Sequence, residues 1–377
     1  MNPSMPIQRN VHIRHVVRQY HPAVGGLEES VAMLARSLNE RSGITSSVVT
    51  LDRLFGDHDT LLAPVDEQEG VQIVRIPFRG STRYPLAPRV LRTLAGADII
   101  HVHGIDFFFD FLAATKPMHR RTLVASTHGG FFHTKFAGSA KKIWFNTITR
   151  GSSYAYHRIF GSSLQDAETF ARIAPARTVA IENGVNVEKW RNAASQVAEP
   201  VLLFIGRFSV NKDLPALIKL IATLGPPWQL IIAGQDSDLT ARDLMAIVAQ
   251  HNAAGLVTIV RAPDNTSLRE LIGRASFIVS ASRYEGFGLS AVEGMSAGLT
   301  PILSAIAPFE RLVRQSGRGR TVDFNNFLLT ADVVRTELIK LKEDTAGNRA
   351  RNISASDAYG WPKVTDSFIS HYRSILG

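Results

Sequence analysis

The chain is organised around one stretch, residues 283–294, which reads Arg283-Tyr284-Glu285-Gly286-Phe287-Gly288-Leu289-Ser290-Ala291-Val292-Glu293-Gly294. An apolar run at 276–280 precedes it and predicts a buried parallel strand, whereas residues 289–297 predict a helix that ends at Gly298. The stretch is therefore expected to form a strand-to-helix loop. At such a loop the unpaired N–H groups of the helix N-terminus favour a bound anion such as phosphate.

Two glutamates in this stretch lie eight positions apart, with a glycine turn between them. Glu285 is expected on the loop and Glu293 on the second turn of the helix, so that two acceptor-only carboxylates face one polyhydroxyl ligand. Gly286 and Gly288 are expected to let that ligand approach the backbone closely. A sugar joined to a phosphate fits this pattern, and the alternative is an ordinary loop with two solvated acids.

Length and composition restrict the class of protein. The 377 residues suffice for two domains, and no stretch approaches the roughly 20 apolar residues that cross a bilayer. Residues 1–10 lack an apolar core, so no secretory signal is expected, and the absence of cysteine is typical of a cytoplasmic protein. The net charge of +9 predicts an anionic partner, which leaves nucleic acid, an anionic membrane face and a diphosphate ligand open.

Strands and helices alternate along the chain in two series, which predicts doubly wound parallel sheets. The first series has expected strands at 11–17, 45–51, 71–77, 98–103, 122–126, 158–161 and 178–181. The second has expected strands at 201–205, 228–233, 257–260, 276–280 and 301–304. A capping-box pattern at 267–270 is expected to open a helix of the second series, and the polar stretch 192–200 is interpreted as a linker.

The predicted fold class is α/β, with two Rossmann-like doubly wound domains facing across a cleft. The expected domains are residues 1–190 and 191–356, followed by a C-terminal helix within 357–377 that packs back on the body. Ligands of such folds bind beyond the carboxyl ends of the strands, so the cleft is the expected ligand site.

Two segments are suited to a diphosphate. Arg207 and Lys212 follow the first strand of the second series; Arg207 supplies a planar fork of donors and Lys212 a mobile point charge. Gly25 and Gly26 precede a helix and resemble a phosphate-cradling loop. The alternatives are a solvated pair of cations and a plain helix-entry turn.

Three histidines stand at strand ends. His128 follows the strand at 122–126 and is a candidate partner for a sugar or a leaving oxygen, with glycines at 129–130 leaving room; the alternative is a structural histidine. His101 and His103 are two apart in a strand and so face one side, as metal ligands do. With no third ligand in register, no metal site is expected.

The region 116–177 is strongly basic, and it also carries apolar and aromatic residues between 135 and 150. Its basic residues are Lys116, Arg120, Arg121, Lys135, Lys141, Lys142, Arg150, Arg158, Arg172 and Arg177, against the two acids Asp166 and Glu168. Basic residues beside aromatics suit an anionic membrane surface. A solvated face remains the alternative, and nucleic acid is not expected because no nucleic-acid motif accompanies the charge.

Together these segments resemble the retaining glycosyltransferases of family 4, which have the architecture called GT-B. The matching residues are Gly25-Gly26-Leu27-Glu28, Glu182-Asn183-Gly184-Val185, Gly206-Arg207, Lys212-Asp213, Glu285-Gly286-Phe287-Gly288, Glu293 and Gly298. The resemblance implies that the first domain binds an acceptor and the second a nucleotide sugar. It also implies that Glu285 holds the donor hexose and Glu293 the ribose, while Arg207 and Lys212 hold the diphosphate.

The segments 126–132 and 160–163 are most similar to members that move an α-mannosyl group from GDP-mannose to a polyprenyl-diphosphate-linked oligosaccharide in exopolysaccharide assembly. This resemblance adds His128 and Ser162 to the site and implies a peripheral enzyme on the inner face of the cell membrane, with no cofactor besides the donor substrate. The implied catalytic residues are His128, Glu285, Lys212 and Arg207. The implied donor-binding residues are Gly25, Gly26, Ser162, Arg207, Lys212, Glu285, Gly286, Phe287, Gly288, Leu289 and Glu293.

Other functions are compatible with parts of the sequence. Another nucleotide sugar, or a phospholipid or lipopolysaccharide acceptor, would keep the same site. A double-Rossmann oxidoreductase would need a Gly-x-Gly-x-x-Gly motif with an acid about 20 residues on, which is missing. A non-catalytic binder of membranes or nucleic acid would use the basic region but would have no need of Glu285 and Glu293.

Overall fold

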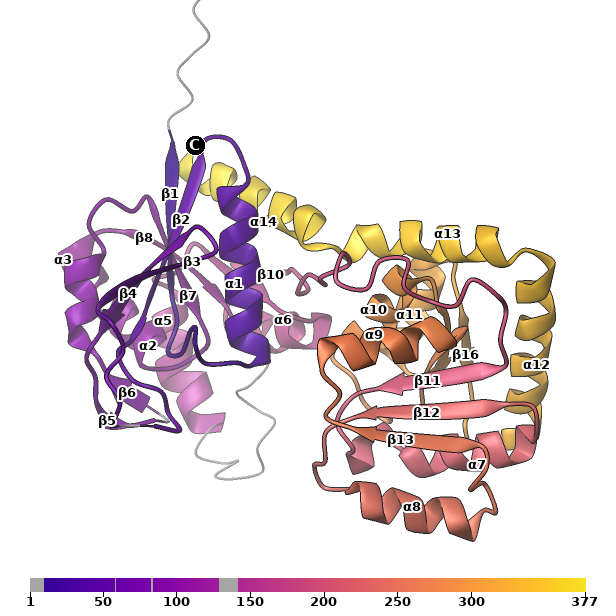
Figure 1. The fold of residues 1–377 in the computed structure, drawn as a ribbon. Coiled ribbons are helices and arrows are strands. Elements are labelled where there is room, and N and C mark those ends of the chain that lie inside the picture. Colours follow the sequence, from indigo (N-terminus) through magenta and orange to yellow (C-terminus); the bar gives the residue numbers. More distant parts are fainter. Residues whose placement is uncertain (1–9, 58, 83, 129–141) are drawn as a thin grey trace, which may run out of the picture. The chain divides into compact units, whose positions relative to one another are not determined.

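The computed structural model describes residues 10–57, 59–82, 84–128 and 142–377, and it divides the chain into two compact units (Figure 1). The first unit comprises Met1–Gly184 and Trp361–Gly377, and the second comprises Val185–Gly360. Each unit is built on one large, mainly parallel sheet with helices packed against it. The predicted fold class, α/β with two Rossmann-like units, is therefore confirmed.

The sheet of the first unit has the strand order β10-β9-β8-β7-β1-β2-β4-β3, and only β3 runs antiparallel to its neighbour. Its strands are β1 (Val11–Val16), β2 (Ile44–Leu51), β3 (Val65–Gln68), β4 (Val71–Ile76), β7 (Ile99–His103), β8 (Thr122–Ser126), β9 (Arg158–Gly161) and β10 (Thr178–Ala180). A small hairpin, β5 (Arg79–Ser81) with β6 (Tyr84–Leu86), lies outside this sheet. Strand order reverses between β1 and β7, and ligands of such sheets bind at this reversal, beyond the carboxyl ends.

Helices cover both faces of this sheet. They are α1 (Gly26–Asn39), a 3-10 helix η1 (Pro88–Thr93), α2 (Phe107–Ala114), α3 (Lys116–His119), a π-helix η2 (Phe145–Thr149), α5 (Arg150–Ser153), α6 (Leu164–Ala171) and α14 (Trp361–Leu376). The helices α1 and α14 lie side by side (Figure 1), and their apolar side chains share one core with Ile13, Ile99 and Val124 of the strands. The chain's last helix thus completes the core of the first unit.

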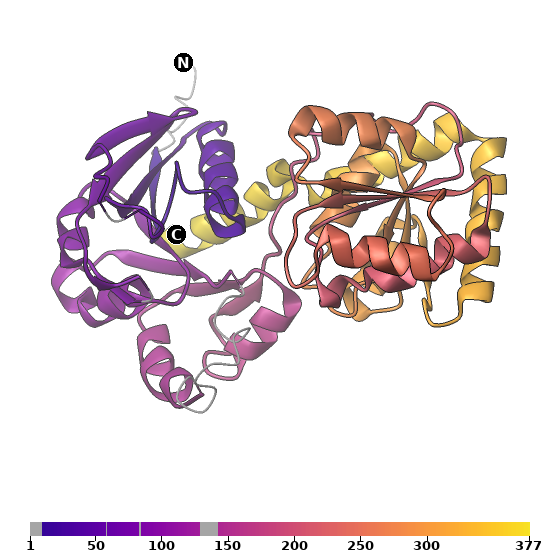
Figure 2. The same cartoon turned by 60° about the horizontal axis from the view of Figure 1, so that its bottom comes forward.

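The second unit contains a sheet of six parallel strands in the order β13-β12-β11-β14-β15-β16. They are β11 (Val201–Ile205), β12 (Gln229–Gly234), β13 (Val257–Arg261), β14 (Phe277–Ser280), β15 (Thr300–Ser304) and β16 (Arg320–Val322). Figure 2 views this sheet nearly edge-on, with helices on both sides. The two central strands, β11 and β14, carry uninterrupted apolar runs because both of their faces are covered.

The helices of the second unit are α7 (Leu214–Leu224), α8 (Ala241–Gln250), α9 (Asn265–Arg274), α10 (Leu289–Ala297), α11 (Ala307–Ser316), α12 (Phe327–Glu343) and α13 (Thr345–Ser356), with short 3-10 helices η3 (Val210–Lys212) and η4 (Asp357–Tyr359). The segment 192–200 is bound to this unit through backbone hydrogen bonds from Asn192 to Ser296 and from Ala194 to Ala297. Within the described part of the chain, no helix combines the length and the apolar character that a membrane crossing requires.

The expected capping box at 267–270 is wrong. Helix α9 begins at Asn265, and Asp264 caps it by accepting a hydrogen bond from the Ser267 N–H at 2.7 Å. Both Asp264 and Ser267 are good capping residues, and the earlier one is used because the helix then gains most of a turn. Ser267 therefore lies inside the first turn of α9 rather than before it.

Candidate functional site

The predicted cation and the predicted loop glutamate meet at the carboxyl edge of the second sheet. Lys212 Nζ forms an ion pair with Glu285 Oε1, and the two side chains are 20% and 15% exposed. Their loops follow the neighbouring strands β11 and β14 and are joined by Asn211, whose Nδ2 donates to the Tyr284 carbonyl at 2.8 Å and whose carbonyl accepts from the Arg283 N–H at 2.9 Å. Adjacent parallel strands thus bring together residues 73 positions apart in the sequence.

Three serines fix the position of Glu285. The Ser282 hydroxyl donates to Glu285 Oε1 at 2.8 Å and lies 2.9 Å from the Ser280 hydroxyl. Ser304, at the end of β15, donates to the Ser282 carbonyl at 2.6 Å. Among the described residues, every hydrogen bond to the Glu285 side chain goes to Oε1, so Oε2 is available to a ligand hydroxyl. These serines were not predicted, and their place at strand ends is the only signal for them in the sequence.

The two glycines of the loop, Gly286 and Gly288, differ in what the structure requires of them. Gly288 has φ of 93°, in the left-handed region, and a Cβ on it would collide with the ring of Phe309. Gly286 is exposed, and a Cβ there would have no neighbour within 4 Å. The fold therefore requires glycine at position 288. At position 286 the fold does not require it, and close approach of a ligand is the remaining reason for a glycine there. Phe287 is half-buried against Tyr359, with ring centroids 5.7 Å apart, and Leu289 begins α10 with a side chain that is 45% exposed.

The remaining predicted residues of the second unit flank this loop. Glu293 is half-buried on the second turn of α10, as the spacing predicts. Arg207 follows β11 on the same loop as Lys212; it is exposed and makes no hydrogen bond or ion pair with the described residues. An exposed guanidinium without a protein partner is suited to a phosphate ligand.

In the first unit, His128 ends the carboxyl side of β8 in a left-handed conformation with φ of 52°. Its Nε2 lies 2.9 Å from His103 Nδ1, whereas its Nδ1 is buried and has no hydrogen-bond partner among the described residues. Burial lowers the pKa of His128 to about 4, so the ring is neutral near pH 7. A neutral ring with one unpartnered nitrogen is equipped to hydrogen-bond a ligand. The glycines at 129–130 lie outside the described residues.

Ser162 lies at the end of the neighbouring strand, β9, and is held by Asp166 of α6. The Ser162 hydroxyl donates to Asp166 Oδ2 at 2.8 Å, and the Thr127 hydroxyl donates to the same oxygen at 2.9 Å. The structure thus brings Ser162 next to the residue that precedes His128. Asp166 was counted in the sequence only as one of two acids in a basic region, and its role in joining the two strand ends was not predicted.

Gly25 and Gly26 stand where the order of the first sheet reverses. Gly25 precedes α1 without a side-chain cap, and Gly26 is exposed with open space where a Cβ would be. Close by, Arg18 Nε pairs with Asp106 Oδ2 at 2.8 Å across the ends of β1 and β7. Burial raises the pKa of Asp106 to about 6, although Arg18 opposes that shift. Gly25 and Gly26 themselves lie at the N-terminus of α1, where unpaired N–H groups favour an anion.

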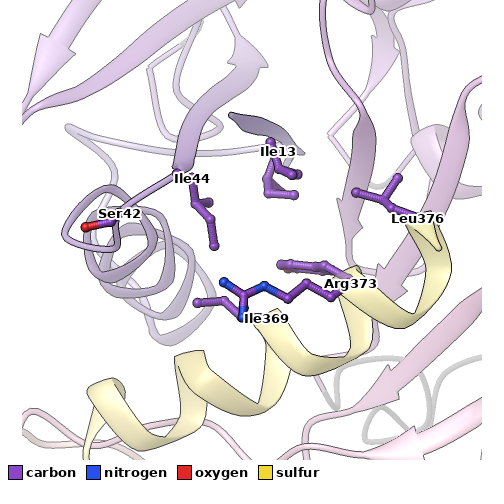
Figure 3. A pocket seen from close by; sticks show the side chains of 9 residues that line it. Ile13, Ser42, Ile44, Ile369, Arg373 and Leu376 are labelled. Atoms are coloured by element: carbon purple, nitrogen blue, oxygen red, sulfur yellow. The ribbon is translucent and has the colours of Figure 1, made fainter. Parts of the chain in front are cut away.

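One cavity of the first unit lies away from these strand ends. It measures about 90 Å³ and lies beneath α14, lined by Ile13, Ile44, Ile369 and Arg373 (Figure 3). Ile44 begins β2, so this cavity is near the amino edge of the sheet, opposite the edge that carries His128 and Ser162. We therefore assign it no part in the candidate site.

A third histidine joins the two that the sequence paired. His15 of β1 lies beside His101 and His103, and one nitrogen from each ring falls within 4.8 Å of the others. The expectation that no third ligand is in register is thus not met. His15 was missed because it lies 86 residues before His101 in the sequence, and only the register of β1 against β7 places the two side by side.

Comparisons with known proteins identify the family. Residues 24–189 match Glycosyltransferase Family 4, and residues 186–353 match Glycosyl transferases group 1. A GDP-mannose:cellobiosyl-diphosphopolyprenol alpha-mannosyltransferase of Komagataeibacter xylinus is 45% identical, over 100% of this chain and 96% of its own length. The protein of the same name from Xanthomonas campestris is 44% identical, over 96% and 97%. A phosphatidyl-myo-inositol mannosyltransferase of Mycolicibacterium smegmatis is 25% identical, over 90% and 92%.

Solved structures agree in fold. Anabaena HepE, crystallised with UDP and glucose, superimposes with a TM-score of 0.69 at 16% identity, covering 97% of this chain and 100% of its own. A sucrose-phosphate synthase of Thermosynechococcus elongatus gives 0.68 at 19% identity, covering 97% and 99%. With the sequence identity over the full chain and the matched family ranges, these findings establish that the chain belongs to the family 4 glycosyltransferases.

Proposed function

We propose that this glycosyltransferase moves an α-mannosyl group from GDP-mannose to a polyprenyl-diphosphate-linked oligosaccharide, with retention of the anomeric configuration. The observation that carries the proposal is the 44–45% identity, over nearly the whole of both chains, to enzymes named for that donor and that acceptor. A relative named for a phosphatidyl-myo-inositol acceptor reaches only 25%. The lipid-linked oligosaccharide is therefore the favoured acceptor.

The charges at the carboxyl edge of the second sheet support a diphosphate leaving group. Arg207 has no ion-pair partner among the described residues and lies on the loop that also carries Lys212. The N-terminus of α10 follows the Glu285 loop directly. In the proposed reaction the bond from the sugar C1 to the phosphate oxygen breaks and a bond from C1 to the acceptor oxygen forms. The acceptor proton passes to the departing phosphate oxygen, and these cations and N–H groups stabilise the charge that develops there.

Glu285 has the role of orienting the sugar. Its Oε1 is already bound by Lys212 and Ser282, which leaves Oε2 to accept hydrogen bonds from sugar hydroxyls. A carboxylate is a charged acceptor, and a charged acceptor forms stronger hydrogen bonds than a neutral one. Glu293 is assigned to the ribose of the nucleotide and His128 to an oxygen of the donor.

The exposed side chains of residues 142–150, around η2 of the first unit, support contact with an anionic membrane surface. We propose that this surface is the cytoplasmic face of the cell membrane. Ile143, Trp144 and Ile148 are 66%, 42% and 45% exposed, and Lys142 and Arg150 flank them. Apolar side chains beside cations bind anionic lipid better than either kind alone. Lys135, Phe136 and Lys141, which the sequence groups with them, lie outside the described residues.

The membrane contact is tested by co-sedimentation with vesicles of anionic and of neutral phospholipid. The double variant Ile143→Ser/Trp144→Ser is expected to lose binding to anionic vesicles. Ile339→Ser, which removes an equally exposed isoleucine (62%) from the second unit, is the matched control and is expected to bind as the wild type does. Undiminished binding by the double variant would assign the contact to another surface.

The transfer itself is tested with the purified protein, a panel of GDP-, UDP- and ADP-sugars, and membrane extract that carries lipid-linked acceptors. Radiolabel from GDP-mannose is expected in the lipid fraction, and label from the other donors is not. Transfer from a UDP-sugar would overturn the mannosyl assignment, and transfer to phosphatidylinositol in place of the polyprenyl lipid would overturn the acceptor.

A further inference from the structure

Four histidines form a contiguous group inside the first unit: the three whose ring nitrogens lie within 4.8 Å of one another, and His128. His15, His101 and His103 are at most 1% exposed, and His128 follows at the end of the next strand. The rings of His101 and His103 stack with centroids 4.1 Å apart, and those of His15 and His128 lie 5.0 and 5.1 Å from His103. The group runs from the sheet interior to its carboxyl edge.

Three of these rings are joined in a chain of hydrogen bonds. His15 Nδ1 lies 2.8 Å from His103 Nε2, and His103 Nδ1 lies 2.9 Å from His128 Nε2. Burial lowers the pKa of all three, with the neighbouring rings adding to the shift for His103, so each ring is neutral near pH 7. A neutral imidazole carries one N–H and one bare nitrogen. The direction of one hydrogen bond therefore dictates the direction of the other.

Two arrangements satisfy both bonds. In the outward one, His15 Nδ1–H donates to His103, His103 Nδ1–H donates to His128, and the His128 proton is left on Nδ1. In the inward one all three protons move to Nε2, and His15 Nε2–H points into the core. His15 Nε2 is buried and has no partner among the described residues. Each arrangement therefore leaves one N–H without a described partner, on His15 in the inward case and on His128 in the outward case. His15 is 0% exposed, whereas His128 is only half-buried at the carboxyl edge of the sheet, and an N–H that water or a ligand can reach costs less than one enclosed in the core, which favours the outward arrangement.

The outward arrangement also puts the unpaired donor where a ligand can use it. His128 Nδ1 is the other buried nitrogen without a described partner, and it belongs to the ring at the carboxyl edge of the sheet. We propose that His15 and His103 are positioning residues that hold His128 in the Nδ1–H tautomer, so that it donates a hydrogen bond to an oxygen of the bound sugar donor. The identity of that ligand rests on the proposed function, whereas the tautomer does not.

A metal ion is the competing use of these rings. Both nitrogens of His101 are already engaged, Nδ1 with the Tyr372 hydroxyl at 2.7 Å and Nε2 with the Ser126 hydroxyl at 2.8 Å. His15 and His103 direct their nitrogens at one another rather than at a common point. A metal would have to break these bonds, so the geometry points to the hydrogen-bond chain.

The tautomer is measured by nitrogen-15 NMR of histidine-labelled full-length protein without ligand. The His128 signals are expected to show a protonated Nδ1 and a bare Nε2. His15→Leu removes the inner hydrogen-bond donor. Both tautomers of His128 are then expected to be populated, although the substituted residue is two rings away from His128. His15→Asn places an amide N–H where His15 Nδ1 stands and is expected to restore the wild-type pattern.

His101→Gln is the matched control, since it removes an equally buried ring of the same group that is not part of the chain. It is expected to lower the melting temperature about as much as His15→Leu while leaving the His128 tautomer unchanged. A wild-type His128 protonated on Nε2 would overturn the proposal. So would an equal effect of His101→Gln on the tautomer, or one equivalent of divalent metal in the purified protein.

Kinetics separate this inference from the proposed function. His15→Leu is expected to reduce kcat/KM for the sugar donor in proportion to the fraction of His128 that leaves the Nδ1–H tautomer, which is about twofold for equal populations, and His15→Asn is expected to recover most of this loss. If His128 has the Nδ1–H tautomer but the protein transfers no mannose, the hydrogen-bond chain is upheld and GDP-mannose is rejected as the sugar donor. Normal kcat/KM in a His15→Leu protein with mixed tautomers would overturn the role of the chain in ligand binding.

Discussion

Ser282 acts on the ligand only through Glu285, which makes its contribution measurable. Its hydroxyl is fully buried and supplies one of the two described hydrogen bonds to Glu285 Oε1. Ser282→Ala is expected to lower kcat by roughly ten- to a hundredfold, because the carboxylate loses one charge-assisted hydrogen bond of about 1.5–3 kcal/mol and gains freedom to turn. Glu285→Ala is expected to abolish transfer in a folded protein.

Steady-state transfer assays measure both variants. Ser356→Ala is the control, because Ser356 is also fully buried in the second unit but donates to the Ile353 carbonyl, within α13. It is expected to leave kcat unchanged. Full activity of folded Glu285→Ala would contradict the assignment of the sugar to this loop.

The two glycines of the Glu285 loop are expected to behave differently in folding. Gly288→Ala should lower the free energy of unfolding by about 1–3 kcal/mol, since it forces a left-handed residue against the Phe309 ring. Gly286→Ala should change it by less than about 0.5 kcal/mol, because its Cβ enters open space. Urea unfolding followed by circular dichroism measures both. Equal losses would show that the Phe309 contact is relieved by repacking.

At the scale of residues, the sequence predicted those site residues that stand in a recognisable pattern of strand, loop and helix. Glu285 and Lys212 were each predicted to lie at the carboxyl end of a parallel strand, because each follows an apolar run, and such strands end at one edge. The ion pair between them was not predicted. Ser282 and His15 were not predicted, because a serine at a strand end or a histidine inside a strand has no distinguishing neighbours. Their roles depend on strand order and register, which a single sequence does not encode locally.

At the scale of elements, the buried strands and the helix α10 were predicted closely, since apolar runs and the left-handed glycine Gly298 mark their bounds. The short strands β3, β5, β6 and β16 were missed because they have only three or four residues and lack alternation of apolar residues. The helices α11 to α13 were passed over although their capping residues, such as Asn326 and Asp344, are recognisable afterwards.

Helix α14 is predicted to stabilise the first unit through one polar contact as well as its apolar face. The Tyr372 hydroxyl is buried against His101 Nδ1 at 2.7 Å. Tyr372→Phe is expected to lower the free energy of unfolding by about 1–3 kcal/mol, because it leaves a buried histidine nitrogen unpaired. Denaturant unfolding measures this loss, and an unchanged stability would mean that His101 finds another partner.

At the scale of the whole molecule, the two units differ in their histidines. His251 is the only histidine in the second unit, whereas the first unit contains the four-ring group. Carboxylates with lowered pKa, such as Asp243, Asp264 and Asp344, stabilise the second unit through capping and ion pairs. These contributions are lost only below the ordinary aspartate pKa of 3.8. Mild acid is therefore expected to act on the first unit.

The sign of this effect follows from linkage. Burial lowers the pKa of His15 to about 3 and of His128 to about 4, and it lowers those of His101 and His103 well below the ordinary 6.5. Between roughly pH 6.5 and 4 the unfolded chain therefore binds protons that the folded unit does not. Each such ring removes up to about 1.4 kcal/mol of unfolding free energy per pH unit as pH falls. Asp106 has a raised pKa of about 6, so the folded unit binds its proton at a higher pH than the unfolded chain does. This stabilisation offsets the loss of unfolding free energy from one histidine ring.

Calorimetry of the full chain at pH 7 and pH 5 measures the outcome. The transition of the first unit is expected to move to lower temperature at pH 5, and that of the second unit to stay nearly constant. His101→Gln removes one ionisable ring, so its first transition should fall less between the two pH values than that of the wild type, even though it starts lower. A first transition that is insensitive to pH would mean that these rings are protonated in the folded protein, which the chain of neutral hydrogen bonds does not allow.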